Sequence, residues 1–423
     1  MLKKIIFSLY LFLGHFGWLS GQQDSILFHF ESKVDSVIKM AIDSHAFPGA
    51  QILVANKEEI LFEKAYGFHT YDSLRMVEAH HLYDLASITK VSTGLPILMN
   101  LVAKGKVDLD EPVSKYLSQW KRSNKKNLTI REILSHQAGL KPYLVFYADM
   151  KSEDDNWKKR SFKNKRKGKY QIHITDSLFM HKRHQRQMTK KIRKTPLGEK
   201  TYRYSGLFFQ MLPKLIEKIK ERSFLEVLDT ELYKPLGISK ELTYLPLYKF
   251  NTEDIIPTEI DSNFRYQLVH GTVHDEAAAM WGGVSCNAGL FGNARSLGKL
   301  FQLYLNNGIH NNIRLIDSNT LKEFTTCQFC EEDNRRGLGF DKPRIEYDEI
   351  LSSVAKDASQ SSFGHSGFTG TLAWADPDHE LIYIFLSNRV YPSRKQRKIY
   401  EMNVRPTIHQ LIYDYFGSKD EVE

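Results

Sequence analysis

Strand-forming runs stand near both ends of this chain, and few folds accommodate that arrangement. Residues 51–67, QILVANKEEILFEKAYG, place two apolar stretches around the turn NKEE, which is the pattern of a β-hairpin. Residues 370–389, GTLAWADPDHELIYIFLSNR, repeat the pattern around DPDHE. The long region between the two hairpins has mainly helical periodicity. We therefore predict an α+β fold: an antiparallel sheet built from both chain ends, with flanking helices and an inserted, mainly helical lobe.

A chain of 423 residues is long enough for two structural units or for one large unit with two lobes. We expect the sheet lobe at about residues 24–85 and 282–423, and the helical lobe at about residues 86–281. Helical spacing of apolar residues predicts helices over 24–47, 206–223 and 400–416. Pro96 follows the start of another predicted helix, so a kink or break is expected near Gly94 and Leu95.

The N-terminus has the pattern of an export signal. Lys3 and Lys4 precede an apolar run, and the small residues Ser20 and Gly21 follow it. These three features are typical of a cleaved signal peptide over residues 1–21, which leaves residues 22–423 as the mature chain. An N-terminal membrane anchor is the alternative, although two glycines and a histidine interrupt the run. We expect a periplasmic or extracellular protein with no integral membrane span once the signal is removed.

The positive charge of the chain is concentrated in one segment. The formal net charge is +9, but residues 151–200 alone hold 17 Lys and Arg against 5 Asp and Glu. Because the rest of the chain is slightly acidic, and an exported protein has little access to nucleic acid, we do not expect a nucleic-acid-binding protein. A solvated, partly mobile surface insertion is the simplest interpretation of the segment. A surface that binds anionic cell-wall polymer or lipopolysaccharide is the alternative.

Three cysteines provide little for a metal or redox site. Cys327 and Cys330 form CQFC and could pair in an exported protein, which would leave Cys286 over. Neither a second pair nor a histidine completes a metal-ligand spacing, so an incidental surface pair is favoured. No metal and no cofactor are expected.

A candidate nucleophile lies in residues 82–94, LYDLASITKVSTG, where Ser87 and Lys90 are three positions apart. On a helix this spacing places both side chains on the same face. A serine hydroxyl needs a nearby base and an electropositive setting before it can attack a carbonyl group, and a helix N-terminus adds partial positive charge. The S-x-x-K pattern is common, however, and by itself it is a weak signal.

Two further segments strengthen this hypothesis. YRYSG places Tyr204 before a predicted helix, and a tyrosine beside a lysine can act as a phenolate-type base. FGHSGFTG places His365 at the start of a glycine-rich strand edge, where substrate can approach the backbone closely. The backbone N–H of Phe368 could then supply one of two oxyanion donors.

Taken together, the three segments resemble the motifs of the penicillin-recognising serine hydrolases, which include class C β-lactamases, DD-peptidases and related esterases. Ser87-x-x-Lys90, Tyr204-Ser205-Gly206 and His365-Ser366-Gly367 follow the family order. The resemblance covers most of residues 30–415. FLSNRVYPS and RRGLGFDKP are most similar to the β-lactamase-type modules that are appended to family 3 glycoside hydrolases.

The resemblance implies a role for each matching position. Ser87 would be the acylated nucleophile, Lys90 would orient and deprotonate it, and Tyr204 would relay the proton. His365 stands where the family has Lys or His. The N–H groups of Ser87 and Phe368 would form the oxyanion hole.

Ser366, Gly367 and Gly206 would contact the substrate.

Two departures from the family pattern lower the expected β-lactam hydrolysis. The second motif usually ends in Asn or Asp, but here it ends in Gly206, so a side-chain amide is missing. The charge of His365 depends on pH, unlike that of a lysine.

The sequence thus predicts an exported serine hydrolase that acts through an acyl-Ser87 intermediate on ester or amide bonds. We expect an esterase or a DD-peptidase-like enzyme on cell-wall-type peptides, with weak or no β-lactam hydrolysis. A non-catalytic module of the same fold, binding peptidoglycan fragments or anionic wall polymer, is the alternative.

Other candidate motifs are less informative. GVSCN and GHSGF lack the final glycine of the G-x-S-x-G nucleophile elbow, which excludes an α/β-hydrolase. His274, Asp275 and Glu276 lack the spacing of a zinc helix and are expected to support the cleft. His136 is expected to be a hydrogen-bonded, partly buried histidine rather than a catalyst.

Overall fold

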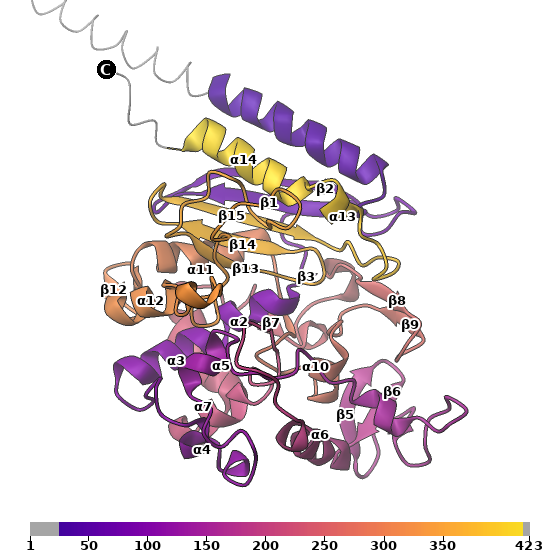
Figure 1. Ribbon diagram of the computed structural model, residues 1–423. Helices are drawn as coiled ribbons and strands as arrows, with labels where there is room; N and C mark the ends of the chain where they lie inside the picture. Colours follow the sequence, from indigo (N-terminus) through magenta and orange to yellow (C-terminus); the bar gives the residue numbers. More distant parts are fainter. Residues whose placement is uncertain (1–24, 418–423) are drawn as a thin grey trace, which may run out of the picture.

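The computed structural model describes residues 25–417, so the predicted signal peptide lies outside the described residues. Its main sheet has five antiparallel strands in the order β13-β14-β15-β1-β2 (Figure 1). The strands are β1 (Gly49–Ala55), β2 (Ile60–Gly67), β13 (Phe363–Ser366), β14 (Leu372–Asp376) and β15 (Leu381–Ser387). The N-terminal and C-terminal hairpins join where β1 pairs with β15, with Leu53 opposite Ile384. The prediction of an α+β fold with a sheet built from both ends is confirmed.

Both faces of this sheet are covered by helices. The side chains of β1 alternate between the two hydrophobic clusters that lie on these faces. Ile52 and Val54 pack into one hydrophobic cluster, whereas Leu53 packs into the other. Because successive side chains of a strand point to opposite faces, one strand supplies both clusters. The helix at residues 25–43 and α14 (Val404–Phe416) cover one face (Figure 1). On the other face, α11 (Ala294–Leu305) contacts β1, β14 and β15.

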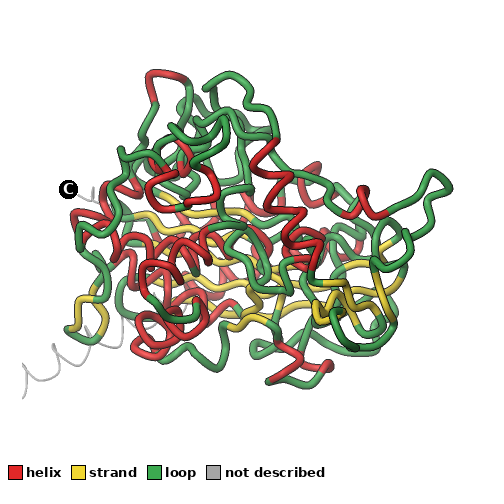
Figure 2. Tube along the Cα trace, turned by 90° about the horizontal axis from the view of Figure 1, so that it is seen from below, coloured by secondary structure: helices red, strands yellow, loops and turns green. Residues whose placement is uncertain are grey.

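The helical lobe packs beyond α11 and contains a second, three-stranded sheet of order β3-β10-β7. Those strands are β3 (Tyr83–Asp84), β10 (Leu290–Gly292) and β7 (Thr243–Tyr244). Seen from below, the molecule shows helices and long loops around its strands (Figure 2). The helices of the lobe are α2 (Thr89–Ser92), α3 (Gly94–Ala103), α4 (Val113–Tyr116), α5 (Ile130–Leu134), α7 (Leu212–Lys220), α8 (Phe224–Leu228), α9 (Lys234–Leu236) and α10 (Glu276–Met280). Two small two-stranded sheets are formed by β8 (Glu259–Asp261) with β9 (Gln267–Val269), and by β11 (Ile309–His310) with β12 (Ile313–Arg314). Two further helices are α12 (Ser318–Thr325) and α13 (Lys398–Glu401).

The predicted break before Pro96 is present. The helix α2 ends at Ser92 and α3 begins at Gly94, and Thr93 between them has a non-helical φ of −132°. Pro96 is then in the first turn of α3, where its missing N–H costs nothing because first-turn N–H groups have no partner within the helix. The apolar run Ala86–Ala103 is long enough to cross a membrane, but 78% of it is buried inside the protein, as expected of a core helix.

Three predicted helices differ in extent from the observed ones. The helix predicted over 24–47 ends at residue 43. The helix expected from residue 206 begins only at Leu212, because Pro213 fits the first turn of a helix but not its interior. The final helix is divided into α13 and α14 at Asn403, whose φ of 49° is left-handed.

The basic segment lies on the surface with most of its charged side chains exposed, as expected, but it also has regular secondary structure that was not predicted. It forms β4 (Phe162–Lys163), β5 (Tyr170–Thr175) and β6 (Leu178–His181), followed by α6 (Arg183–Lys194). Along α6, His184, Met188 and Ile192 are four residues apart and all buried. This apolar stripe anchors the segment to the lobe, so the lobe is less helical than expected.

The structure pairs two of the three cysteines. Cys327 and Cys330 form a disulfide, which the sequence left open, and Cys286 is buried as a free thiol.

Candidate active site

Ser87 lies in a strained turn directly after β3. It is the middle residue of the 3-10 turn Ala86–Ile88. Ala86 has a φ of 45°, in the left-handed region that non-glycine residues rarely occupy. The buried carboxylate of Asp84 stabilises this turn by accepting hydrogen bonds from the N–H groups of Ala86 (2.8 Å) and His274 (2.6 Å). Burial raises the pKa of Asp84 above its ordinary value.

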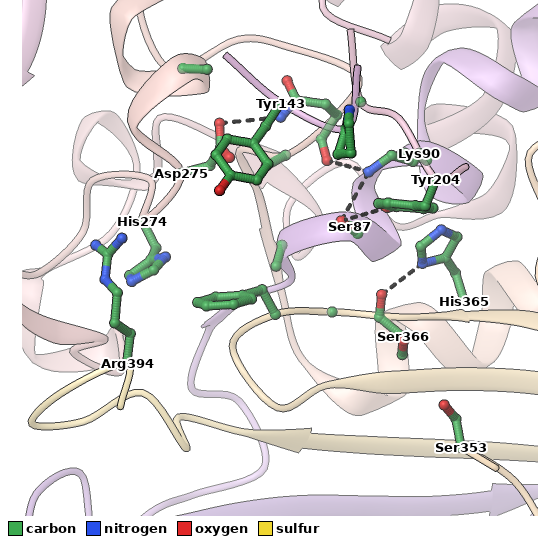
Figure 3. A pocket seen from close by; sticks show the side chains of 18 of the residues that line it. Ser87, Lys90, Tyr143, Tyr204, His274, Asp275, Ser353, His365, Ser366 and Arg394 are labelled. Carbon is green, nitrogen blue, oxygen red and sulfur yellow. Dashed lines mark hydrogen bonds between the residues drawn. The ribbon is translucent and has the colours of Figure 1, made fainter. Parts of the chain in front are cut away.

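Two side chains converge on the Ser87 hydroxyl (Figure 3). Lys90 Nζ donates to Ser87 Oγ at 2.9 Å and to the backbone oxygen of Asn287 at 3.0 Å. Tyr204 OH donates to Ser87 Oγ at 3.1 Å. Lys90 is only 2% exposed, so its amine is held inside the protein rather than in solvent. The structure thus brings together the three residues that the first two motifs predicted.

The ring of Tyr204 is enclosed by nitrogen-bearing groups. His136 packs against it with the ring centroids 4.5 Å apart, and the His365 ring lies 5.9 Å away. Lys90 Nζ and the Arg336 guanidinium carbon each lie 5.2 Å from the centroid of the Tyr204 ring.

His365 lies on β13 and does not behave as a cation. Its side chain is 2% exposed, and its Nδ1 donates to the backbone oxygen of Ser366 at 2.6 Å. Burial, and secondarily the charges of Arg336 and Lys90, lower the pKa of His365 to about 3. At neutral pH this imidazole is therefore uncharged.

The third motif brings the sheet edge against the nucleophile turn. A Cβ atom on Gly367 would lie 2.7 Å from the backbone oxygen of Leu85, so only glycine allows this approach. The chain then turns at Phe368, which is 49% exposed. Arg389 holds this turn by donating from Nε to the Phe368 oxygen at 2.9 Å.

These groups line a cavity of about 830 Å³. Ser366, Gly367 and Gly206, all predicted to contact substrate, are among its lining residues. A Cβ on Gly206 would meet only the Cβ of Asn287, at 3.6 Å, which is ordinary van der Waals contact. The volume falls in the range of small-molecule and peptide sites.

The segment at 274–276 lines the same cavity, in agreement with its expected supporting role. Asp275 caps α10 by accepting from the Ala278 N–H at 2.7 Å, and it also accepts from Asn287 Nδ2 at 3.2 Å. His274 Nε2 lies 2.8 Å from a carboxylate oxygen of Glu259. The segment is thus tied to the residues on both sides of it.

The expectation for His136 is only half met. Its Nδ1 accepts from the Ser205 N–H at 3.2 Å, but its Nε2 is buried with no partner among the described residues. It is 2% exposed, so it is fully rather than partly buried. Its contact with the Tyr204 ring gives it a place next to the reaction centre.

Three residues at the site were missed from sequence. Asp84 stands three positions before Ser87, where a short-range turn pattern could have identified it. Asn287 and Arg336 reach the cavity from segments far from the motifs. Asn287 is the last residue of GVSCN, and Arg336 lies in RRGLGFDKP, but neither residue was given a role at the site from these patterns.

One potential metal-binding group occurs among residues 25–417. Ligand atoms of Glu78, His80 and His81 lie within 4.8 Å of one another. None of the three lines the cavity at Ser87, and the Arg75 guanidinium lies 3.5 Å from His81 Nε2, which disfavours a cation.

The fold and the grouping of Ser87, Lys90 and Tyr204 define a serine hydrolase of the β-lactamase and transpeptidase type. A family model described as Beta-lactamase matches residues 34–404. The chain belongs to this family.

Relatives with sequence similarity include a Salmonella agona protein that carries the provisional name D-alanyl-D-alanine carboxypeptidase. It is 31% identical over 389 residues, covering 84% of this chain and 82% of the relative. Solved structures show the same fold at lower identity. A penicillin-binding protein homologue from Caulobacter crescentus has a TM-score of 0.62 at 17% identity, over 90% of this chain and 97% of that one. A family VIII carboxylesterase has a TM-score of 0.59 at 19% identity, over 84% and 91%.

Proposed function

We propose that this hydrolase is exported and cleaves ester or amide bonds through an acyl-Ser87 intermediate. The observation that carries the proposal is the convergence of Lys90 and Tyr204 on one hydroxyl at the wall of a substrate-sized cavity. A serine with two proton-handling groups within hydrogen-bonding distance is what nucleophilic catalysis requires.

In the proposed reaction, Ser87 Oγ attacks the substrate carbonyl carbon and its proton passes to the phenolate oxygen of Tyr204. Lys90 orients Ser87 and takes part in its deprotonation. The N–H groups of Ser87 and Phe368 hold the resulting oxyanion. Tyr204 then protonates the leaving group as its bond to the carbonyl carbon breaks, which leaves acyl-Ser87. A water molecule then attacks the acyl carbon and gives a proton to Tyr204. The bond from the acyl carbon to Ser87 Oγ breaks, Tyr204 returns the proton to Oγ, and the acid leaves.

The substrate class we propose is an ester or a short cell-wall-type peptide, as in an esterase or a DD-peptidase. Relatives and structural neighbours named as a carboxypeptidase and a carboxylesterase support this range. We propose weak or no β-lactam hydrolysis, because Gly206 offers no side-chain amide and His365 is uncharged at neutral pH.

Export to the periplasm or the cell exterior is supported by two independent features. Residues 1–21 have the composition of a signal peptide. The disulfide between Cys327 and Cys330 is of a kind that persists mainly in oxidising compartments.

We also propose that the basic segment, residues 151–200, binds anionic cell-wall polymer. Of its lysine and arginine side chains, only Lys151, Lys191 and Lys200 form ion pairs within residues 25–417. The others leave a large uncompensated positive charge on one part of the surface, which attracts polyanions.

The catalytic assignment is tested by Ser87→Ala and Lys90→Ala, each assayed on an activated ester. Each variant is expected to lose at least about 10³-fold in kcat/KM while remaining folded, because members of a coupled catalytic set fail together. Lys104→Ala, at an exposed lysine just after α3, should keep wild-type activity.

If Ser87→Ala kept most of the activity while Lys90→Ala lost it, another residue would be the nucleophile. If both variants kept the activity, the reaction would take place at another site. A folded wild-type protein with no activity on the ester would favour the non-catalytic module.

A further inference from the structure

Four nitrogen-bearing groups face Tyr204 from different elements. They are Lys90 from α2, His136 after α5, Arg336 from the segment before β13, and His365 on β13. Asp275 lines the same cavity, and Asp341 and Tyr202 contact Arg336. The charge that Tyr204 experiences depends on which of these groups are ionised.

Both histidines are uncharged near neutral pH. Burial, together with the neighbouring cations, lowers the pKa of His365 to about 3 and the pKa of His136 well below its ordinary value. The third-motif position, where related enzymes carry Lys or His, therefore contributes no positive charge here.

Arg336 is in the opposite state. Burial lowers the pKa of Arg336, but Asp341, Tyr202 and Tyr204 together outweigh burial and raise that pKa above its ordinary value. The residue is 5% exposed and lines the catalytic cavity. It is therefore a permanent cation, held 5.2 Å from the centroid of the Tyr204 ring.

The positive charge of Arg336 is only partly compensated. Asp341 lies 3.2 Å from Arg336 Nε and is shared with Arg335, at 2.9 Å. One carboxylate therefore balances two guanidinium groups. In addition, Arg336 Nη1 is buried with no partner among the described residues. A buried donor without a partner is costly, and such features are retained mainly where they serve a function.

We propose that Arg336, rather than His365, supplies the fixed positive charge beside Tyr204 that assists the transfer of the Ser87 proton to it. Arg336 acts through Tyr204 and is a positioning residue for the proton transfer: the phenolate oxygen takes the proton of Ser87 Oγ as the bond from Oγ to the carbonyl carbon forms. This inference rests on the proposed function, since it assumes acylation of Ser87.

The test is the pH dependence of kcat/KM for an activated ester. Arg336→Gln removes the charge but keeps hydrogen-bonding groups for Tyr202 and Asp341. It should move the acid limb of the profile upward by about one pH unit, the usual effect of one nearby charge, so that activity falls about tenfold on that limb and recovers at high pH. Arg336→Lys should keep the wild-type limb. Arg336→Met replaces the Gln variant if that variant fails to fold.

Arg335→Gln is the matched control, because Arg335 shares Asp341 but does not line the catalytic cavity. The acid limb of the Arg335→Gln profile should stay at the wild-type pH. The acid limb of the His365→Gln profile should also stay there, even if the overall rate of either variant falls. A loss in Arg336→Gln that is equal at every pH, or an equal shift in Arg335→Gln, would overturn the inference. So would a shift in His365→Gln alone. The proposed function fails separately, if a fluorophosphonate does not label Ser87 in the wild-type protein.

Discussion

The Ser87 hydroxyl accepts hydrogen bonds from residues that are 3 and 117 positions away in the chain. Lys90 reaches it by helical geometry alone. Tyr204 reaches it only because residues 136–142 hold the segment before α7, for example through the Arg203 N–H, which donates to the His136 oxygen at 2.9 Å. The backbone oxygen of Asn287, from a third segment, holds the Lys90 amine in place. Reactivity at one atom therefore depends on local geometry and on long-range packing together.

The proposed preference for esters over amides gives a specific role to Gly206. We predict that Gly206→Asn raises kcat/KM for peptide or lactam substrates relative to simple esters by a few-fold to about tenfold. One hydrogen bond to the substrate amide is worth about 0.5–1.5 kcal/mol, and an ester such as nitrophenyl acetate has no such amide. The cavity has room for the new side chain, since its Cβ would meet only Asn287 at 3.6 Å.

Gly206→Ala is the control for this comparison, because it adds the Cβ without the amide. Matched ester and amide substrates are assayed on all three proteins. An amide-to-ester ratio that is the same in the Asn variant as in the Ala variant would mean that position 206 does not face the substrate.

At the residue scale, the sequence predicted what depends on local spacing. Ser87 and Lys90 follow from an i, i+3 pair, and the third-motif glycine follows from a close backbone approach. The uncharged state of His365 could not be predicted, because it comes from burial beneath neighbouring elements. Arg336 was missed for the same reason: its contacts with Tyr204 and Asp341 are tertiary.

At the scale of elements, the strands of the main sheet were predictable, because their apolar alternation and turn residues are local signals. The start of α7 was misplaced, since the apolar run from residue 206 matches helical spacing and only Pro213 marks the true first turn. The strands β4, β5 and β6 were missed. β4 (Phe162–Lys163) is too short to give a pattern. β5, YQIHIT, does contain the aromatic and β-branched residues that favour a strand, but the lysine-rich sequence before it led us to interpret the segment by its charge.

The basic segment gives a prediction at this scale. Replacing Lys165, Arg166, Lys167 and Lys169 by Ser is expected to weaken binding to immobilised lipopolysaccharide severalfold and to leave small-ester hydrolysis unchanged. The four side chains are exposed between β4 and β5, so substitution should not disturb the sheet. Removal of the whole stretch would instead delete β4. Wild-type binding should also weaken as salt rises, because a Debye length of about 8 Å at physiological ionic strength screens exposed charges.

The control replaces four exposed lysines outside the segment, Lys104, Lys106, Lys121 and Lys126, by Ser. An equal loss of binding in this control would mean that binding depends on the net charge of the protein and not on the basic segment. Binding that is independent of salt and survives the first set of substitutions would remove the segment from the function.

At the scale of the whole molecule, the site is assembled where the two parts of the chain meet. The edge strand β13 supplies His365, Ser366 and the turn at Phe368, whereas the helical lobe supplies Ser87, Lys90 and Tyr204. Because β13 pairs with β14 in a sheet that also needs β1, both chain ends are required to place one wall of the cavity. This explains why the family resemblance extends over most of the chain rather than over three short motifs.

The most direct test of the acyl-Ser87 account is intact-protein and peptide mass spectrometry after exposure to a fluorophosphonate and, separately, to a penicillin. We predict a stoichiometric fluorophosphonate adduct on Ser87 that is absent from Ser87→Ala, and little or no penicillin adduct at the same residue. A lasting penicillin adduct on Ser87 would favour a DD-peptidase over an esterase, because it requires acylation without rapid hydrolysis. Rapid turnover of penicillin would contradict the proposed weak or absent β-lactam hydrolysis. No adduct on Ser87 with either reagent, in folded protein, would contradict the central claim and favour a binding module of the same fold.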